Sequence, residues 1–238
     1  MNFELEKGGF IQWSSGVKAV TYNQKIIALS EVFNDFVFFD DGQSKFLLSV
    51  LGTRSSKLSQ EDLRAVNDLI SHGLISLKET CPKQIFQDEI NSKGAFECDW
   101  ALGGRRVGLS NFNLKYFIKA TRLLLFAKKN SDKGKLHQML EDLRGFSSSA
   151  MVENECELIK IASNVNLAVF FLWRKVKCLE FSYAVARIAF RHNIKCRFVV
   201  GVQTHPFISH AWVEGSNGVV FDRKELPKEL AKIVLIGK

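Results

Sequence analysis

Short apolar runs separated by turn residues fill the first 79 residues, a pattern that predicts strands followed by two helices and one last strand. Asn23 and Asn34 mark two of the turns, and Ser59 followed by Asp62 marks the start of the second helix. The expected strands are 18–22, 25–30 and 36–40, the helices are 43–51 and 59–72, and the last strand is 74–77. This order is typical of a winged-helix-like domain.

Residues 112–173 instead keep apolar side chains at steps of three and four residues without proline, which predicts helices. The expected helices are 112–129, 132–144 and 152–173, and a further helix begins at Cys178, with Leu179, Tyr183, Ala186 and Phe190 on its apolar face. Strands are expected at 197–203, 209–214 and 219–222. The second half is therefore expected to combine a helical part with an antiparallel sheet, and the whole chain to be of the α+β class.

The junction between the two halves is rich in residues that interrupt regular structure. Pro82 and the Gly103-Gly104 pair break the pattern between residues 80 and 111. We therefore expect one domain at 1–79, a linker at 80–111 and a second domain at 112–238. A length of 238 residues suits two domains of this size.

Cys178 stands at the expected start of a helix. Unpaired backbone N–H groups and the positive end of the helix dipole favour a thiolate at such a position, and the thiolate is the nucleophilic form of cysteine. Cys178 is therefore a candidate nucleophile. A backbone N–H at the start of the same helix is the candidate donor to an oxyanion.

A predicted hairpin supplies a base and a carboxylate. His210 lies in an alternating strand, the Gly-Ser-Asn-Gly sequence at 215–218 predicts a tight turn, and the strand after the turn ends at Asp222. A short turn places Asp222 within two positions of His210, and a three-residue loop at 215–217 pairs the two directly. The carboxylate would then fix the imidazole tautomer and leave the other ring nitrogen for a cysteine.

Several coupled motifs occur in order between residues 176 and 222: Cys-Leu-Glu at the start of an apolar helix, the strand Val-Val-Gly-Val, His-Ala-Trp-Val-Glu and a final Phe-Asp. Together they resemble the lasso-peptide biosynthesis B protein, a family of transglutaminase-like leader peptidases. The resemblance implies a transglutaminase-like (papain-like) cysteine protease domain. It also implies that Cys178 is the nucleophile, His210 the base and Asp222 the residue that orients the base.

The remaining cysteines and histidines are weaker candidates. His205 precedes a proline in an expected loop, and Cys196 opens a strand rather than a helix. An isolated cysteine is usually a small buried hydrophobic residue. This applies to the cysteines without a base nearby in the sequence, which are Cys81, Cys98 and Cys156. Of the tryptophans, Trp173 is a candidate wall of the site, and Trp212 either shields the site or packs in the core.

No metal or nucleotide site is expected in this chain. Its five cysteines are never spaced as Cys-x-x-Cys, and neither the Gly-x-x-x-x-Gly-Lys-Ser/Thr loop nor Gly-x-Gly-x-x-Gly occurs. ATP, if it is required, would be bound by a partner. No signal peptide opens the chain, and the longest apolar run, 167–173, is too short to cross a bilayer. A cytoplasmic protein without membrane insertion is therefore expected.

Charge argues against nucleic acid as a partner. Residues 1–80 carry eight basic and ten acidic side chains, whereas the rest of the chain carries 25 basic and 15 acidic ones. The helix at 59–72 has one arginine against Glu61, Asp62 and Asp68. Affinity for nucleic acid depends on neutralising phosphates, so this net acidic half is a poor DNA-binding module. The basic half could meet an acidic peptide, although a solvated face is favoured.

The order of elements in residues 1–79 resembles the PqqD-like peptide-recognition domain that is fused to some lasso B proteins. In that family a leader peptide adds as an extra strand at the sheet edge and packs against a helix. The resemblance places a groove between the strand at 36–40 and the helix at 59–72. The candidate substrate-binding residues are Phe36, Val37, Phe38, Phe39, Leu63 and Val66, together with Trp212 near the triad.

These features predict a leader peptidase that cleaves the leader from a ribosomally synthesised lasso-peptide precursor. The resemblance implies that the core peptide then passes to an asparagine-synthetase-like, ATP-dependent cyclase that closes a macrolactam. Two other functions remain open. The same triad would serve an acyl transferase that forms amide cross-links, and a chain in which the triad is coincidental would be a non-catalytic peptide-binding or nucleic-acid adaptor.

Overall fold

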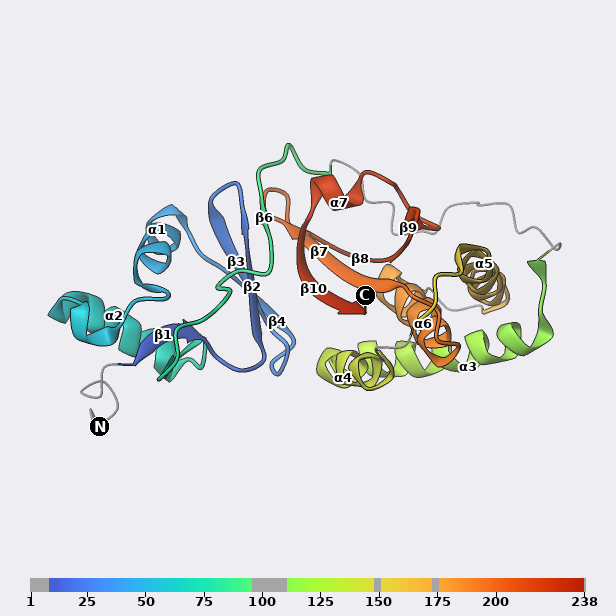
Figure 1. Cartoon of the computed structure of the whole chain (residues 1–238), viewed down its shortest axis with the longest axis horizontal. Coiled ribbons are helices and arrows are strands. Elements are labelled where there is room, and N and C mark those ends of the chain that lie inside the picture. Colours follow the sequence, from blue (N-terminus) through green and yellow to red (C-terminus); the bar gives the residue numbers. More distant parts are fainter. Residues whose placement is uncertain (1–8, 96–110, 148–150, 173–175, 238) are drawn as a thin grey trace. The chain divides into compact units, whose positions relative to one another are not determined.

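The computed structural model of the chain describes residues 9–95, 111–147, 151–172 and 176–237. Its backbone contacts divide it into two compact units, Met1–Ser92 and Lys93–Lys238. Each unit has its own helices and strands, which are labelled in Figure 1. The described part mixes helices and sheets, as the α+β prediction expects.

The first unit is built on an antiparallel meander of three strands. They are β2 (Val17–Tyr22), β3 (Lys25–Ser30) and β4 (Asp35–Phe38), with β3 in the middle. Tyr22 pairs with Lys25, so Asn23 and Gln24 form a two-residue loop, and both have a positive φ, 49° and 65°. Positive φ at both loop positions matches the twist of the flanking strands. The prediction of a strand at 25–30 is confirmed.

Two α-helices and a short 3-10 helix follow the meander: α1 (Asp41–Val50), η2 (Ser55–Lys57) and α2 (Gln60–Ser71). The Asp40 carboxylate accepts the N–H of Gln43 at 2.7 Å, and the Gln43 side chain accepts the N–H of Asp40 at 3.1 Å. This reciprocal capping box starts α1 two residues before the predicted position. Ser59 caps α2 as predicted, since its hydroxyl accepts the N–H of Asp62 at 3.1 Å.

A second, two-stranded sheet completes the first unit. β1 (Phe10–Trp13) pairs antiparallel with β5 (Ile75–Lys78). β5 lies one residue after the predicted strand at 74–77, whereas β1 is absent from the prediction because its four residues form too short a pattern. The order of the meander, the helices and the last strand agrees with the prediction. Whether this unit is PqqD-like stays a proposal.

Residues 84–92 belong to the first unit, which corrects the prediction of a linker over 80–111. β6 (Glu89–Ile90) pairs parallel with β2 at the edge of the meander. Ile85 and Phe86 pack against the hydrophobic core of the same unit. These apolar side chains attach the segment in spite of its turn residues. Most of the remaining predicted linker lies outside the described residues.

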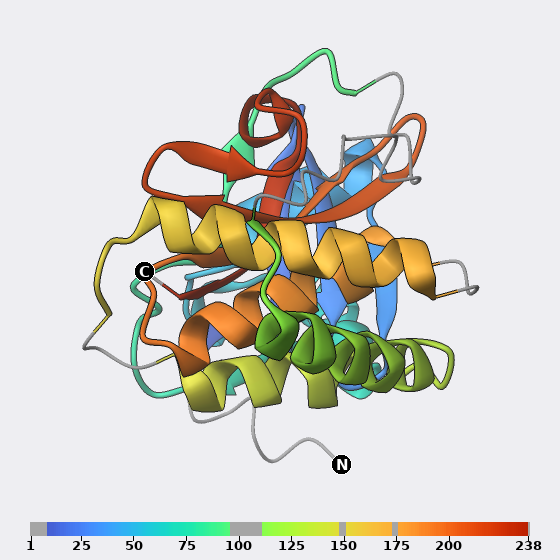
Figure 2. The ribbon, with the colours of Figure 1, turned by 90° about the vertical axis from the view of Figure 1, so that its right-hand side faces the viewer.

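In the described part of the second unit, four long helices pack beside one sheet, as the ribbon in Figure 2 allows the reader to follow. They are α3 (Leu114–Ser131), α4 (Leu136–Phe146), α5 (Glu155–Phe171) and α6 (Cys178–Arg191). α6 lies at the centre, because every residue from Glu180 to Phe190 is buried and the helix contacts the other three. The first three helices begin two to four residues later than predicted, and α6 begins at Cys178 as predicted. None of the described helices is both long and apolar enough to cross a bilayer.

An antiparallel sheet completes the second unit. Its strands, in the order β10-β7-β8-β9, are β7 (Arg197–Gln203), β8 (Ile208–Gly215), β9 (Gly218–Val220) and β10 (Ala231–Gly237), and the short α7 (Leu226–Glu229) precedes β10. β7 has its predicted bounds, and β8 contains the predicted strand at 209–214. β10 is missing from the prediction although its sequence is apolar and β-branched.

Asp142 of α4 holds the central helix in place. Its carboxylate accepts hydrogen bonds from the Tyr183 hydroxyl at 2.6 Å and from Arg187 Nε at 2.5 Å. The Arg187 guanidinium also lies over the ring of Phe146, 3.3 Å from its centroid. Burial, followed by the hydrogen bond to Asp142, raises the pKa of Tyr183, so the phenol remains a donor. A buried arginine is tolerated here because a carboxylate and an aromatic face surround it.

Candidate active site

Cys178 is the first residue of α6, and only 8% of its surface is exposed. Lys177 is the N-cap, and its N–H donates to Glu180 Oε2 at 2.8 Å, which holds the first turn together. The N–H groups of Cys178 and Leu179 lie in this first turn, where an α-helix has no preceding carbonyl to accept them. The thiol therefore lies at the positive end of the helix dipole, as predicted.

The hairpin that carries His210 has a different register from the one that pairs it directly with Asp222. Gly215 pairs with Gly218, so the loop has two residues and not the three that would pair His210 directly with Asp222. A two-residue loop is the form that Ser-Asn between glycines supports without splaying the strands. The broader expectation, that Asp222 lies within two positions of His210 along the hairpin, holds.

A local turn directs Asp222 toward His210. β9 ends at Val220, and Phe221 has a positive φ of 57°, so the chain leaves the extended conformation before Asp222. Asp222 Oδ2 then lies 2.7 Å from His210 Nε2, and its other oxygen accepts the N–H of Arg223 at 2.8 Å. The carboxylate is thus oriented by the backbone on one side and binds the imidazole on the other.

His210 is buried between the carboxylate and the thiol, with 4% of its surface exposed. Burial lowers its pKa, but the hydrogen bond to Asp222 and the interactions with the nearby Cys178 thiol and Asp222 carboxylate outweigh burial and raise the pKa from 6.5 to about 9. Asp222 binds Nε2, which leaves Nδ1 as the ring nitrogen for Cys178. The structure therefore places His210 between Asp222 and Cys178, a Cys-His-Asp order in which the imidazole can serve as the base for a cysteine nucleophile.

The competing candidates lie in less suitable surroundings. Burial, and to a smaller degree the charge of Glu155, raises the pKa of Cys196 to about 12, so its thiol stays protonated. His205 lies in an exposed turn. Cys81 and Cys156 are exposed on the surface. Cys98 and Trp173 lie outside the described residues.

The proposed substrate groove of the first unit needs correction at two positions. Phe39 and Val66 are 6% and 0% exposed and belong to the hydrophobic core, so they cannot meet a peptide directly. Phe36, Val37 and Leu63 are half-buried, and Phe38 is 45% exposed. Of the predicted binding residues in this unit, Phe38 is thus the one with the most accessible side chain.

Trp212 lies beside the imidazole rather than in contact with solvent. It is 1% exposed, and its ring is stacked on that of His210 with centroids 6.3 Å apart and planes 19° from parallel. The indole belongs to a small core with Val199 and Leu230. Both readings of this residue in the sequence are therefore partly correct, because Trp212 is a core residue that also forms one wall around His210.

Two residues that support this arrangement are absent from the predicted site. A Cβ atom on Gly201, which pairs with His210 across the ladder, would lie 2.5 Å from the Trp212 ring. Ser182, one turn after Cys178, donates its hydroxyl to the carbonyl of a residue in β8. A glycine within an apolar strand signals a close approach, whereas the serine carries no such signal in the sequence.

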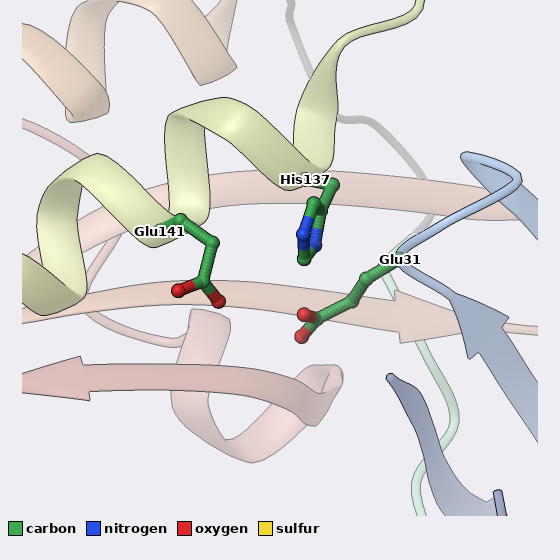
Figure 3. Close-up of side chains that lie close together, drawn as sticks. All are labelled: Glu31, His137 and Glu141. Carbon is green, nitrogen blue, oxygen red and sulfur yellow. The ribbon is translucent and has the colours of Figure 1, made fainter. Parts of the chain in front are cut away.

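A metal site is not proposed from the described residues. His137 and Glu141 project from neighbouring turns of α4, as Figure 3 shows, and both are exposed. Two ligands on one helix are too few for the four-ligand sites that zinc prefers, and exposed acidic groups are common without a metal.

Comparison with known proteins finds a family model and one curated relative that match part of the chain. Residues 123–235, which include all three triad residues, match the family described as the transglutaminase-like superfamily. The chain is also 39% identical over 84 residues to the microcin J25-processing protein McjB of Escherichia coli, an alignment that covers 35% of this chain and 40% of that protein. No solved structure matches the chain significantly. Residues 123–235 of the second unit are thus similar to transglutaminase-like domains.

Proposed function

We propose that this chain is a cysteine leader peptidase that removes the leader from a ribosomally synthesised lasso-peptide precursor. The observation that carries the proposal is the buried His210, bound to Asp222 at 2.7 Å and close enough to Cys178, at the start of α6, for its pKa to be affected. The similarity to a protein named for processing microcin J25 supports a role in peptide maturation. Because the chain spans less than half of that relative, the substrate is part of the proposal.

Cleavage follows from the positions of the three side chains. The Cys178 thiolate attacks the carbonyl carbon at the junction of leader and core, and the His210 imidazolium gives its proton to the leaving amine. The peptide bond breaks, the leader remains as a thioester on the sulfur, and the core leaves with a new amino terminus. His210 then takes a proton from water, which hydrolyses the thioester. Asp222 stabilises the charged imidazole throughout.

The first turn of α6 is the proposed oxyanion site. The N–H groups of Cys178 and Leu179 lie there, and the dipole of a 14-residue helix ends at the same place. Negative charge that develops on the carbonyl oxygen would be stabilised by these donors. This part of the mechanism needs no side chain.

The first unit is the proposed site of leader recognition. β4 is the last strand in the order of its four-stranded sheet, and an edge strand can accept an extended peptide as a further strand. Phe38 adds an exposed aromatic side chain beside this edge. A PqqD-like function of this unit, with the leader bound along β4, follows as part of the proposal.

The free amino terminus of the released core peptide indicates which enzyme acts next. Hydrolysis releases a core peptide with a free α-amine, which is the nucleophile that macrolactam formation needs. An asparagine-synthetase-like cyclase that activates a side-chain carboxylate with ATP is therefore the proposed partner. In this scheme the present chain binds no cofactor itself.

The test is incubation of the purified protein with its precursor peptide, with and without the cyclase and ATP, followed by intact mass measurement. We expect a free leader acid from the wild-type protein and from a Cys156→Ala control, and none from Cys178→Ala. Leader binding should survive in Cys178→Ala. Cleavage that persists in Cys178→Ala would contradict the proposal, and an unchanged precursor in every condition would leave a peptide-binding adaptor.

The similarity to the transglutaminase-like superfamily favours a second candidate function. The same thioester could pass its acyl group to an amine instead of water, which would make the chain an acyl transferase. The mass experiment separates the two reactions, because hydrolysis adds one water to the leader and transfer gives an amide-linked product.

A further inference from the structure

Glu214 stands two positions beyond Trp212 on β8 and is bound to it. Glu214 Oε1 accepts the indole N–H of Trp212 at 3.1 Å. Strand side chains alternate, so His210, Trp212 and Glu214 project from the same face. The carboxylate therefore holds the ring that lies against the imidazole.

Two cations fix Glu214 in turn. Lys232 of β10 donates to Oε1 at 2.8 Å, and Arg197 of β7 lies 3.5 Å from Oε2. The Glu214 side chain is only 12% exposed. A carboxylate with two cationic partners and little solvent has few alternative positions, so it is a rigid acceptor for the indole.

The residues around Trp212 also fit closely against its ring. Gly201 lies directly opposite His210, and its missing side chain leaves room for the indole, since a Cβ there would approach the ring to 2.5 Å. Leu230 and Val199 belong to the same apolar cluster as the indole. Apolar contacts have little directionality, whereas the hydrogen bond from Nε1 fixes the orientation of the ring in its plane.

From these contacts we infer that Glu214 is a positioning residue for the proposed reaction: through Trp212 it holds the His210 ring between Cys178 and Asp222 and keeps water from the imidazole. The inference rests on the proposed function of the triad. The described contacts of Glu214 are to Trp212, Lys232 and Arg197. Its effect on His210 therefore passes through the indole. Among the described residues, the titratable groups that act on His210 directly are Cys178 of α6 and Asp222 after β9.

Loss of this support should show in the titration of His210. Its pKa is raised from 6.5 to about 9 because the hydrogen bond to Asp222 and the interaction with the nearby Cys178 outweigh burial. An imidazole that is held less firmly becomes more hydrated and forms a weaker hydrogen bond to Asp222. The pKa of His210 should therefore move back toward 6.5. We expect Glu214→Ala to lower the midpoint by about one pH unit, a roughly tenfold weaker proton affinity. Glu214→Gln keeps an oxygen for the indole N–H and should retain most of the shift.

The experiment is NMR titration of the full chain with labelled histidine rings, in which the five histidines are assigned by substitution. Glu153→Gln is the matched control, because Glu153 is an exposed carboxylate paired with Lys195 at 2.7 Å. It should leave the His210 midpoint in place. The titration needs no peptide substrate, so its result stands whether or not the chain cleaves a leader.

A double-mutant cycle shows whether Glu214 acts through Trp212. Trp212→Phe keeps an aromatic ring but removes the N–H, so adding Glu214→Ala to it should change the His210 midpoint by less than a third of the single-mutant shift. Additive shifts would overturn the inference, as would a folded Glu214→Ala protein with the wild-type midpoint. If Glu214→Ala does not fold, the His210 midpoints of the Glu214→Gln and Trp212→Phe proteins are compared instead. An unshifted His210 midpoint in Trp212→Phe would also overturn the inference.

Discussion

The hydroxyl of Ser182 donates to the backbone carbonyl of Ala211 at 2.9 Å, and both residues are buried. Ser182 lies one turn after Cys178, and Ala211 follows His210 directly in β8. The bond therefore joins the helix of the nucleophile to the strand of the base. Apolar packing between a helix and a sheet has little directionality, whereas a directed hydrogen bond fixes one point of contact between them.

Removal of this bond should lower the cleavage rate clearly while reducing the free energy of unfolding only modestly. Ser182→Ala leaves a gap of one hydroxyl and should cost about 1 kcal/mol of unfolding free energy. A small displacement of Cys178 from His210 should reduce the cleavage rate about tenfold, because reaction rates depend steeply on the positions of reacting groups. Thr121→Ala is the control, since the Thr121 hydroxyl donates within its own helix to Phe117 at 2.9 Å. Equal cleavage rates for the two variants would contradict the role of Ser182.

The raised pKa of His210 predicts how stability depends on pH. A group whose pKa is about 9 when folded and 6.5 when unfolded stabilises the fold fully below pH 6.5, and this contribution disappears as the pH rises through 9. The loss is on the order of 3 kcal/mol. Urea unfolding between pH 6 and pH 9.5 should show it in the wild-type protein. Asp222→Asn removes the carboxylate that favours the imidazolium, so its stability should change much less over the same range.

Gly201 should not tolerate a side chain. Gly201→Ala places a Cβ 2.5 Å from the Trp212 ring and 2.9 Å from Leu230 Cβ. Strain of this kind costs about 1–3 kcal/mol, and relief by displacement of the indole would also disturb His210. Thermal unfolding should therefore show a lower midpoint. In contrast, Gly145→Ala on α4 meets nothing within 4 Å, and it should leave the midpoint unchanged or raise it.

Leader recognition should be separable from catalysis. Phe38→Asp introduces a charge beside the edge of β4 and should weaken leader binding about tenfold or more, measured by fluorescence anisotropy of a labelled leader peptide. Val32→Asp is the control, since Val32 is 61% exposed but lies before β4. The reaction of Cys178 with a small thiol reagent should be the same in both variants. Unchanged affinity for the leader in Phe38→Asp would argue against binding along β4.

Local signals in the sequence were sufficient for most elements of secondary structure. The apolar periodicity of 178–191 predicts α6, and Ser59 with Asp62 predicts the start of α2, because caps and periodic apolar faces depend on neighbouring residues only. Strands β1, β6 and β10 were missed. β1 and β6 are too short for a pattern, and each of the three exists because a distant strand pairs with it.

The chemistry of the triad was also predictable, and its geometry only in part. The order of Cys178, His210 and Asp222 indicates the three roles, and a tight hairpin brings the last two near each other. The sequence could not decide the loop length, because Gly-Ser-Asn-Gly allows both two and three residues. The left-handed Phe221, which carries Asp222 to the imidazole, has no signal in its side chain.

What the sequence by itself determined is therefore the set of chemical groups, the helix start that exposes Cys178 and the hairpin that carries His210. Only the tertiary structure decided that Ser182 ties the helix to the strand, that Gly201 makes room for Trp212 and that Glu214 holds the indole. These contacts join residues whose partners lie on other turns and strands. Local periodicity is a property of neighbouring residues, whereas the position of a reactive group depends on the packing of the whole unit.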